Sequence, residues 1–396
     1  MKVRIVTLGC KLNFAESSAL MNTLLSRGYE RAKDGEEADV VIVNTCTVTD
    51  TADHKDRQAI HRLRRENPNA RLIVTGCYAR LKPQEIAQMV EVDHVVQKPL
   101  ERFVPARSKD DRTRCFLKVQ DGCNYFCTYC TIPMARGRSR NAPISEVVQQ
   151  ARLALQEGAK EIVLTGVNIG DFGRSTNEQF IDLVKALDDI TVYDTDNNII
   201  NYRIRISSCE PNLLLDDIIR FVASSEHFAP HFHIPLQSGS DEMLRIMHRH
   251  YDTALFAERI HTIRQLMPHA FIGVDCMVGV RGETEQRWNE YLRFVEGLEV
   301  SQLHVFTYSE RANTRMLTMP LEVVSQQERD RRSHILHKVS ENKLRQFYLK
   351  HQGEQRWVLW ESRNNRGQMF GFSDNYIKVS RPFSQDKVNT FELVAL

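Results

Sequence analysis

Three cysteines fall within one short run of this chain, between Asp121 and Pro133. Cys123, Cys127 and Cys130 have the spacing C-x3-C-x2-C, in a stretch without helical or strand periodicity. One loop with this spacing can direct three thiolates at three irons of a [4Fe-4S] cluster, and the fourth iron then stays open. A structural zinc site, the main alternative, usually takes four ligands in paired knuckles, and the sequence offers no fourth Cys or His close by. We therefore predict a [4Fe-4S] cluster in which one iron has no protein ligand. An iron of this kind can bind a reactant, which catalysis requires.

Length and composition set the broad class of the protein. The chain has 396 residues, of which 42% are hydrophobic, and this length favours about two or three domains. No apolar run approaches the roughly 18 residues that a membrane span needs. The first residues alternate apolar and charged side chains, which predicts a strand rather than a signal peptide. We therefore expect a soluble cytoplasmic protein with no membrane partner.

Cysteine usage and charge add two further constraints. The nine cysteines are an odd number, and without a signal peptide they favour metal ligation over disulfides. The net charge is only +2, but residues 331–396 carry twelve Lys and Arg against six Asp and Glu. This basic end suggests an appended nucleic-acid-binding module, with a merely solvated basic face as the alternative.

Residues 1–96 alternate short apolar strands with helical patterns, which predicts a doubly wound, parallel-sheet domain. Three more cysteines, Cys10, Cys46 and Cys77, each follow one of the predicted strands. The ends of parallel strands meet at one edge of such a sheet, so the three thiolates should converge. We predict a second three-cysteine [4Fe-4S] site there, although three separately buried cysteines would be the simpler reading. The predicted strands are 3–8, 38–43 and 70–74, and the helices are 13–27, 51–65 and one from near Pro83.

Residues 97–114 are rich in charge and proline and read as a linker. From 115 to 350 six further strand and helix patterns predict a partial (β/α)6 barrel, open at its side, with the loop of Cys123 at the carboxyl ends of the strands. Residues 351–396 change to short strands and turns, typical of a small OB-like β-barrel that binds RNA. The predicted barrel strands are 115–119, 161–165, 203–207, 231–236, 271–278 and 303–308, with helices that include 145–156, 241–248 and a long charged one, or a pair, in 320–350.

A C-x3-C-x2-C loop at the first strand end of a partial barrel resembles the radical S-adenosylmethionine (radical SAM) superfamily. The three strand-end cysteines and the small C-terminal barrel make nearly the whole chain similar to a methylthiotransferase, with an N-terminal cluster domain, a radical SAM domain and a TRAM domain. The motifs that carry the resemblance are Gly9-Cys10-Lys11-Leu12-Asn13, Asn44-Thr45-Cys46-Thr47-Val48-Thr49, Gly76-Cys77-Tyr78-Ala79 and Arg136-Gly137-Arg138-Ser139-Arg140.

Methylthiotransferases act on isopentenyladenosine in tRNA, on threonylcarbamoyladenosine in tRNA, or on an aspartate of a ribosomal protein. Two strings look like the threonylcarbamoyladenosine branch, the MtaB type: the run from Cys46 to Gln58 and Leu164-Thr165-Gly166-Val167-Asn168-Ile169-Gly170. The other two substrates, and a non-enzymatic iron–sulfur sensor that binds RNA, remain alternatives. Two stretches depart from the family pattern, Gly279-Val280-Arg281-Gly282-Glu283-Thr284 and Val305-Phe306-Thr307-Tyr308-Ser309. The resemblance therefore does not predict the precise shape of the barrel mouth.

The resemblance implies a methylthio group added at C2 of the adenine, with tRNA as partner and a separate electron donor and sulfur source. The cluster on Cys123, Cys127 and Cys130 would bind S-adenosylmethionine, and the auxiliary cluster on Cys10, Cys46 and Cys77 would hold the sulfur that is transferred. A radical is implied because no side-chain base removes an aromatic C–H at neutral pH.

Polar residues at predicted barrel strand ends are weaker candidates for contacts with S-adenosylmethionine, and many such residues only cap loops. Tyr129 would pack on the adenine or simply shield the cluster. Arginines after the cluster loop suit a threonylcarbamoyl carboxylate or phosphates, or form a solvated basic loop. The strand-end candidates are Thr165, Gly166, Asn168, Ser207, Ser208, Glu210, Gln237 and Ser238, and the arginines are Arg136, Arg138 and Arg140.

Three remaining cysteines, Cys115, Cys209 and Cys276, lie in or just beyond predicted strands and read as small core residues. His231 and His233 alternate on one strand. Packing or a local hydrogen bond is the expected role of His233 rather than metal ligation, because it lacks partner ligands.

Overall fold

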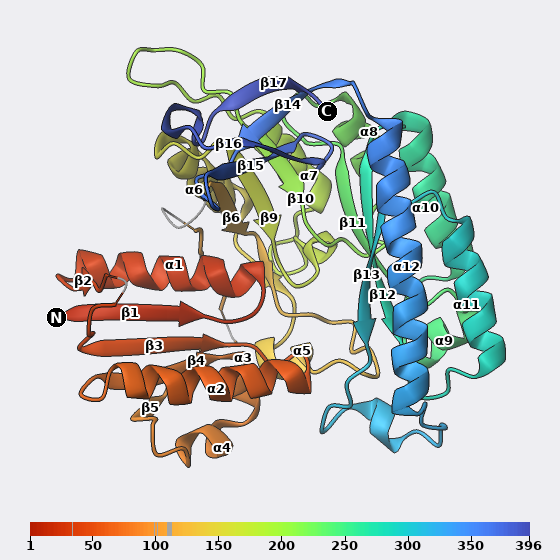
Figure 1. Cartoon of the computed structure of the whole chain (residues 1–396), viewed down its shortest axis with the longest axis horizontal. Coiled ribbons are helices and arrows are strands. Elements are labelled where there is room, and N and C mark those ends of the chain that lie inside the picture. The colour runs from red at the N-terminus through yellow and green to blue at the C-terminus, as the bar shows by residue number, and fades with distance from the viewer. Residues whose placement is uncertain (34, 99, 101, 109–112) are drawn as a thin grey trace.

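A computed structural model describes residues 1–33, 35–98, 100, 102–108 and 113–396. Figure 1 shows a sheet domain at the N-terminus, a curved array of strands and outer helices in the middle, and a small sheet at the C-terminus. None of the helices within these described ranges has the length and apolar character needed to cross a membrane. Parts of the predicted linker, residues 99, 101 and 109–112, lie outside the described residues.

The N-terminal sheet has five parallel strands in the order β2-β1-β3-β4-β5. Val41 and Val43 face one side with residues of α2, whereas Val40 and Ile42 face the other with residues of α1. Helices on both faces of a parallel sheet confirm the predicted doubly wound fold. The strands are β1 Lys2–Thr7, β2 Glu30–Arg31, β3 Val40–Thr45, β4 Arg71–Gly76 and β5 His94–Val95, and the helices are α1 Lys11–Ser26, α2 Asp50–Glu66, α3 Cys77–Leu81 and α4 Pro83–Ala87.

Six parallel strands form the central array, in two sheets of order β10-β9-β6 and β11-β12-β13. A parallel bridge from Ser208 to His233 joins the two sheets. The array remains open between β6 and β13, with helices packed on its outer face (Figure 1), and this confirms the predicted partial barrel. The strands are β6 Arg114–Lys118, β9 Glu161–Thr165, β10 Arg203–Ile206, β11 His231–Gln237, β12 Phe271–Val278 and β13 Gln302–Thr307; the helices are α5 Ile132–Arg136, α6 Ile144–Gln156, α7 Phe180–Asp188, α8 Asp216–Ser224, α9 Asp241–Ile246, α10 Thr253–Leu266 and α11 Glu285–Gly297.

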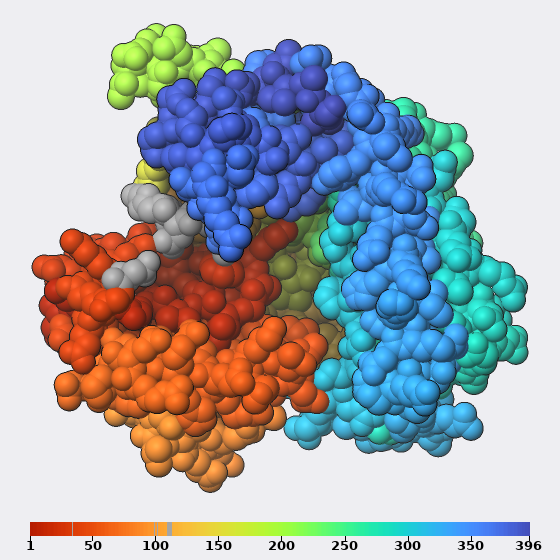
Figure 2. Space-filling model, in the orientation of Figure 1, coloured from red at the N-terminus to blue at the C-terminus, as the bar shows by residue number. Residues whose placement is uncertain are grey.

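The open side of the barrel is bordered by the N-terminal domain and by one long helix. Helix α1 packs against β6, and α12 (Gln326–Lys350) runs along β13. Figure 2 shows a deep hollow between the N-terminal domain and α12. Short elements complete this part of the chain: β7 Gln120–Asp121 pairs with β8 Arg140–Asn141, and single turns of 3-10 helix lie at η1 Ile169–Asp171 and η2 Arg315–Thr318.

The C-terminal residues form a curled antiparallel sheet of order β16-β15-β14-β17, which is consistent with the predicted small β-barrel. Strand β16 begins at Lys378, because Tyr376 has a positive φ of 65° and ends a turn. The strands are β14 Gln355–Trp360, β15 Gln368–Ser373, β16 Lys378–Pro382 and β17 Phe391–Ala395, with η3 at Gln385–Lys387.

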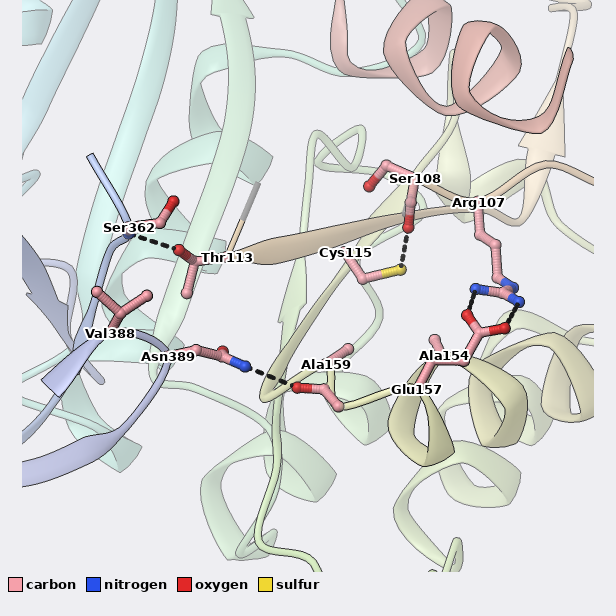
Figure 3. A pocket seen from close by; sticks show the side chains of 11 residues that line it. Arg107, Ser108, Thr113, Cys115, Ala154, Glu157, Ala159, Ser362, Val388 and Asn389 are labelled. Atoms are coloured by element: carbon pink, nitrogen blue, oxygen red, sulfur yellow. Dashed lines mark hydrogen bonds and ion pairs between the residues drawn. The ribbon is translucent and has the colours of Figure 1, made fainter. Parts of the chain in front are cut away.

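Two sets of contacts fasten this sheet to the barrel. Arg203 and Arg205 extend from β10 and donate to backbone carbonyls of β14, β15 and the turn after β15, while Glu161 of β9 accepts from both arginines. The second set lies at a pocket between the barrel and the C-terminal sheet (Figure 3), whose volume is ≈210 Å³. There Asn389 Nδ2 donates to the carbonyl of Gly158 (2.8 Å), and both residues line the pocket.

Candidate iron–sulfur and substrate site

The first cysteine triad, Cys10, Cys46 and Cys77, lies at the carboxyl edge of the N-terminal sheet. Cys10 follows β1 and caps α1, Cys46 follows β3, and Cys77 begins α3 directly after β4. Because β1, β3 and β4 are adjacent parallel strands, their ends bring the three thiols to one edge. Cys46 and Cys77 are buried, whereas Cys10 is exposed.

Two glycines make room for this triad. Gly9 has φ +103°, and a Cβ there would lie 2.9 Å from Cys46 Sγ. Gly76 has φ +100°, and a Cβ there would lie 2.4 Å from the carbonyl oxygen of Thr45. Both positions combine a left-handed backbone with a close approach, so only glycine fits without strain.

The surroundings of these thiols suit a bound metal cluster. Burial raises the pKa of Cys46 to about 12, and the neighbouring thiols of Cys10 and Cys77 add to the shift. Burial also raises the pKa of Cys77, while Arg136 opposes the shift. Such thiols become thiolates when a cation compensates their charge, which the irons of a cluster do.

The second triad, Cys123, Cys127 and Cys130, occupies the loop between β7 and α5. Backbone hydrogen bonds fix the loop: Cys123 donates to the carbonyl of Gly137, and Cys130 donates to that of Cys127, both at 3.0 Å. Thr128 Oγ1 donates to the carbonyl of Ile246 at the end of α9 (2.9 Å), which anchors the loop to the barrel.

Each sulfur of this loop accepts a hydrogen bond. The amide of Tyr125 donates to Cys123 Sγ and the amide of Ile132 to Cys130 Sγ, both at 3.4 Å. Arg249 Nη1 donates to Cys127 Sγ at 3.0 Å. Burial raises the pKa of all three thiols, to about 12 for Cys123 and Cys130. Donors aimed at sulfur stabilise thiolates and tune the potential of a cluster that they hold.

Within the described ranges, no three Cys, His, Asp or Glu side chains converge closely enough to hold a single metal ion. In a [4Fe-4S] cubane each thiolate binds a different iron, so three more widely spaced thiols remain compatible with a cluster.

Two family models match the parts of the chain that carry the triads. Residues 2–97 match the uncharacterized protein family UPF0004, and residues 117–295 match the radical SAM superfamily. The threonylcarbamoyladenosine tRNA methylthiotransferase MtaB of Bacillus subtilis (strain 168) is 35% identical over 96% of this chain and 90% of its own length. The MtaB of Aquifex aeolicus (strain VF5) is 33% identical over 96% of this chain and 97% of its own length. This chain belongs to the radical SAM methylthiotransferase family.

A solved structure shares the fold of this methylthiotransferase chain. It is the radical S-adenosylmethionine methyltransferase TsrM from Kitasatospora setae, with cobalamin and a [4Fe-4S] cluster bound. The two chains are 14% identical, and the match covers 80% of this chain and 76% of TsrM with a TM-score of 0.55. At this identity the comparison supports the fold alone.

Family membership implies S-adenosylmethionine and [4Fe-4S] clusters as cofactors, and two strand-end residues offer unpaired polar atoms to a ligand. Asn168 is buried, with no hydrogen-bond partner among the described residues for either amide atom. Gln237, at the end of β11, has an unpaired Oε1 and a positive φ of 66°. Unpaired buried polar groups are costly, so atoms of this kind mark positions that a ligand can complete.

The other strand-end candidates have partners or lack a polar side chain. Thr165 Oγ1 donates to the carbonyl of Val163 (3.0 Å), and Ser238 Oγ accepts from the amide of Ser240 (3.3 Å). Glu210 pairs with Arg249. Ser207 is buried and Ser208 forms the bridge to β11, while a Cβ at Gly166 would lie 2.8 Å from Ile169.

Arg249 is a functional candidate that the sequence did not reveal. Its guanidinium donates hydrogen bonds to Cys127 Sγ, to the Tyr129 hydroxyl (3.3 Å) and to the carboxylate of Glu210. Burial raises the pKa of Glu210, and Arg249 opposes that shift. Arg249 follows α9 in Met247-His248-Arg249-His250-Tyr251, a string without cysteine and far from the cluster loop in sequence, so only the tertiary structure connects it to that loop.

The three arginines after the cluster loop have different environments. Arg136 is buried and pairs with Glu16 (3.2 Å) and Asp121 (3.0 Å). Arg140 pairs with Asp121 as well (3.0 Å). These ion pairs favour structural roles for both, whereas Arg138 is exposed over the ring of Phe126 and stays a candidate for RNA contact.

Glu16 is the centre of the contact between the N-terminal domain and the barrel. It accepts from Lys98 (2.7 Å), Lys118 (2.9 Å) and Arg136. Burial would raise the pKa of Glu16, but these cations hold it well below its usual range. The carboxylate therefore ties α1, which begins after Cys10, to the strand that leads into the second cysteine loop.

The remaining cysteines and histidines agree with their expected roles. Cys115, Cys209 and Cys276 are buried in the barrel core. His233 Nε2 lies 2.7 Å from Asp275 Oδ1, which is a local hydrogen bond.

Proposed function

We propose that this chain transfers a methylthio group to C2 of N6-threonylcarbamoyladenosine beside the anticodon of tRNA. The observation that carries the proposal is the near-full-length similarity to two relatives named for this activity. The chain also presents the two cysteine triads that such a reaction requires, on neighbouring domains in contact through Glu16.

The two triads have separate roles in this proposal. Cys123, Cys127 and Cys130 hold the cluster that binds S-adenosylmethionine, and Cys10, Cys46 and Cys77 hold the auxiliary cluster. When bound, these groups supply the radical that activates the adenine C2–H bond and the sulfur that replaces its hydrogen.

The residues of the protein bind and orient S-adenosylmethionine and shield the cluster loop from water. Arg249 donates to Cys127 Sγ and thereby biases the loop toward its thiolate form. Asn168 and Gln237 offer unpaired buried atoms to the polar groups of S-adenosylmethionine. Tyr129, held by Arg249 through its hydroxyl, excludes water beside Cys127. A separate electron donor and a sulfur source complete the reaction.

The domain assignment follows the same proposal. Residues 1–96 form the auxiliary-cluster domain, 97–114 the linker, 115–350 the radical SAM domain and 351–396 a TRAM domain that binds tRNA. Residues 351–396 carry six Lys and Arg against five Asp and Glu and expose Trp357, and an exposed aromatic residue among cations suits a nucleic-acid surface. The target base must leave the stacked loop to reach the barrel. We place the protein in the cytoplasm with its tRNA substrate.

Nucleoside mass spectrometry tests the function directly. tRNA from cells lacking the gene should lose methylthio-threonylcarbamoyladenosine, and plasmid-borne wild-type chain should restore it. A plasmid encoding Cys127→Ala is the matched control and should not restore it. Loss of methylthio-isopentenyladenosine instead, or no change in any tRNA nucleoside, would contradict the proposal; a changed ribosomal-protein aspartate would point to the protein-modifying alternative.

A further inference from the structure

A cavity of ≈570 Å³ lies between the first residue of α1 and the edge of the barrel that α12 borders. Figure 2 shows this side as the hollow between the N-terminal domain and α12. Lys11, directly after Cys10, lines it from the N-terminal domain. Protein groups lie close to the Lys11 side chain, but the residue is exposed to solvent.

The opposite wall of the cavity is a cluster of rings on β11, β12 and β13. His233 and His304 lie with ring centroids 5.0 Å apart, and Asp275 binds His233. His304 covers Gly273, where a Cβ would lie 2.9 Å from its Nε2, so the missing side chain makes room for the ring. His231 completes the wall: it is buried, and its Nδ1 has no hydrogen-bond partner within the described ranges.

Lys11 is a cation without a counter-ion. It has no ion pair or hydrogen bond with any described residue. Among nearby carboxylates, Glu161 is bound by Arg203 and Arg205, and Asp275 by His233. Glu341 of α12 also lines the cavity, but it forms no ion pair with Lys11. The positive charge in this concave site therefore calls for an anion from outside the chain.

We propose that Lys11 and the ring cluster of β11 and β13 receive the carboxylate-bearing substituent of the substrate adenine. This proposal rests on the proposed function, in which the base carries an N6-threonylcarbamoyl group. That group ends in a carboxylate and a hydroxyl, which an ammonium and imidazole N–H groups can bind. An isopentenyl group is apolar and gains nothing from an ammonium, so Lys11 is a specificity-determining residue.

The position of Lys11 fits this role. It directly follows Cys10, and the cavity that it lines extends from the N-terminal domain to β11, β12 and β13 of the barrel. Two of the three arginines that the sequence suggested for the carboxylate, Arg136 and Arg140, are engaged by Asp121, whereas Arg138 lies over the ring of Phe126. Lys11 is thus a cation of this cavity that has no hydrogen-bond or ion-pair partner among the described residues.

Binding of short RNA tests the proposal without chemistry. Cluster-loaded protein is titrated with two anticodon stem–loops, one with N6-threonylcarbamoyladenosine and one with unmodified adenosine. We expect the wild-type chain to bind the modified RNA at least about tenfold more tightly, as a charge-assisted hydrogen bond implies. Lys11→Met should remove this preference, so that this variant binds both RNAs equally, while Lys11→Arg should keep most of it.

Lys33→Met is the matched control, since Lys33 is exposed on the same domain away from the cavity, and it should keep the full preference. Equal iron content and melting temperature of Lys11→Met and wild type show that the variant is folded. An undiminished preference in Lys11→Met, or none in the wild type, would overturn the proposal. Failure of the proposed function is separate, because it appears as unchanged nucleosides in tRNA from cells lacking the gene.

Discussion

Each cysteine triad contains three thiols, but different parts of the structure bring these thiols together. Cys123, Cys127 and Cys130 belong to one loop, held by its own backbone hydrogen bonds and anchored to α9. The triad of Cys10, Cys46 and Cys77 depends on the register of three parallel strands and on Gly9 and Gly76. A local site can be read from spacing, whereas a distributed site can be read only if the topology of the sheet is also predicted.

Their electrostatic surroundings differ as well. In the loop triad a buried guanidinium, that of Arg249, donates directly to the sulfur of Cys127. At the strand triad Arg136 opposes the upward pKa shift of Cys77 from a distance, while its own hydrogen bonds go to Asn13, Glu16 and Asp121. We infer that direct donation tunes the loop site and that the arginine near the strand site mainly joins the two domains.

Removing either triad has the largest expected effect, and it separates their roles. Cys123, Cys127 and Cys130 changed together to alanine should abolish both methylthiolation and reductive cleavage of S-adenosylmethionine. The same change at Cys10, Cys46 and Cys77 should abolish methylthiolation and leave cleavage. Chromatography of 5′-deoxyadenosine from reduced protein measures the difference; loss of cleavage in both folded variants would contradict separate roles.

Glu16→Gln should destabilise the contact between the two domains. It removes the carboxylate that pairs with Lys98, Lys118 and Arg136 and leaves Asp121 as the partner of the last two, and loss of one member of a buried ion pair costs up to about 3–5 kcal/mol. Denaturant unfolding at neutral pH measures the loss, and Glu66→Gln, on an exposed pair with Arg62, should change little.

The pH dependence of this variant gives an independent check. The pKa of Glu16 lies below its ordinary value of 4.5 in the folded chain. The ion pairs of Glu16 therefore make their full contribution to the free energy of unfolding above pH 4.5. This contribution is lost as the pH falls through the lower pKa of the folded chain. Glu16→Gln should flatten this part of the stability profile, and an unchanged profile would show that Glu16 does not carry it.

Arg249→Met should affect the loop triad alone. Groups that bind a metal ligand typically contribute about 10–100-fold in activity or metal affinity. We expect a loss in that range for S-adenosylmethionine cleavage and a shifted reduction potential, with the iron of the strand triad retained. Arg264→Met, which removes backbone contacts far from both triads, is the control. An unshifted potential would assign Arg249 a purely structural role.

Gly76→Ala should affect the strand triad alone and has the smallest expected effect on stability. An alanine at this φ is strained and meets Thr45, at a cost of about 1–3 kcal/mol. Gly28 also has a positive φ, but the Cβ that Gly28→Ala introduces would meet nothing within 4 Å. Both variants are compared by iron content, and only Gly76→Ala should lose iron.

The sequence predicted most of this fold because its patterns are local or topological. Alternating apolar strands and helices predicted the N-terminal parallel sheet and the parallel strands of the barrel, and cysteines at strand ends predicted the candidate cluster site. It could not reveal Arg249, since its partners Cys127 and Glu210 are remote in the chain. The same limit applies to Arg136, whose basic string resembles an exposed loop although folding buries it against Glu16 and Asp121. Long-range ion pairs leave no periodic signal.

The central claim is that the two triads hold two separate clusters, and iron quantification after anaerobic reconstitution tests it most directly. The wild-type chain should bind about eight irons, and each triple-alanine variant about four, because each triad serves one [4Fe-4S] cluster. Retained helical circular dichroism shows that the variants are folded. Four irons in the wild-type chain, or loss of all iron on removing one triad from a folded protein, would contradict the account.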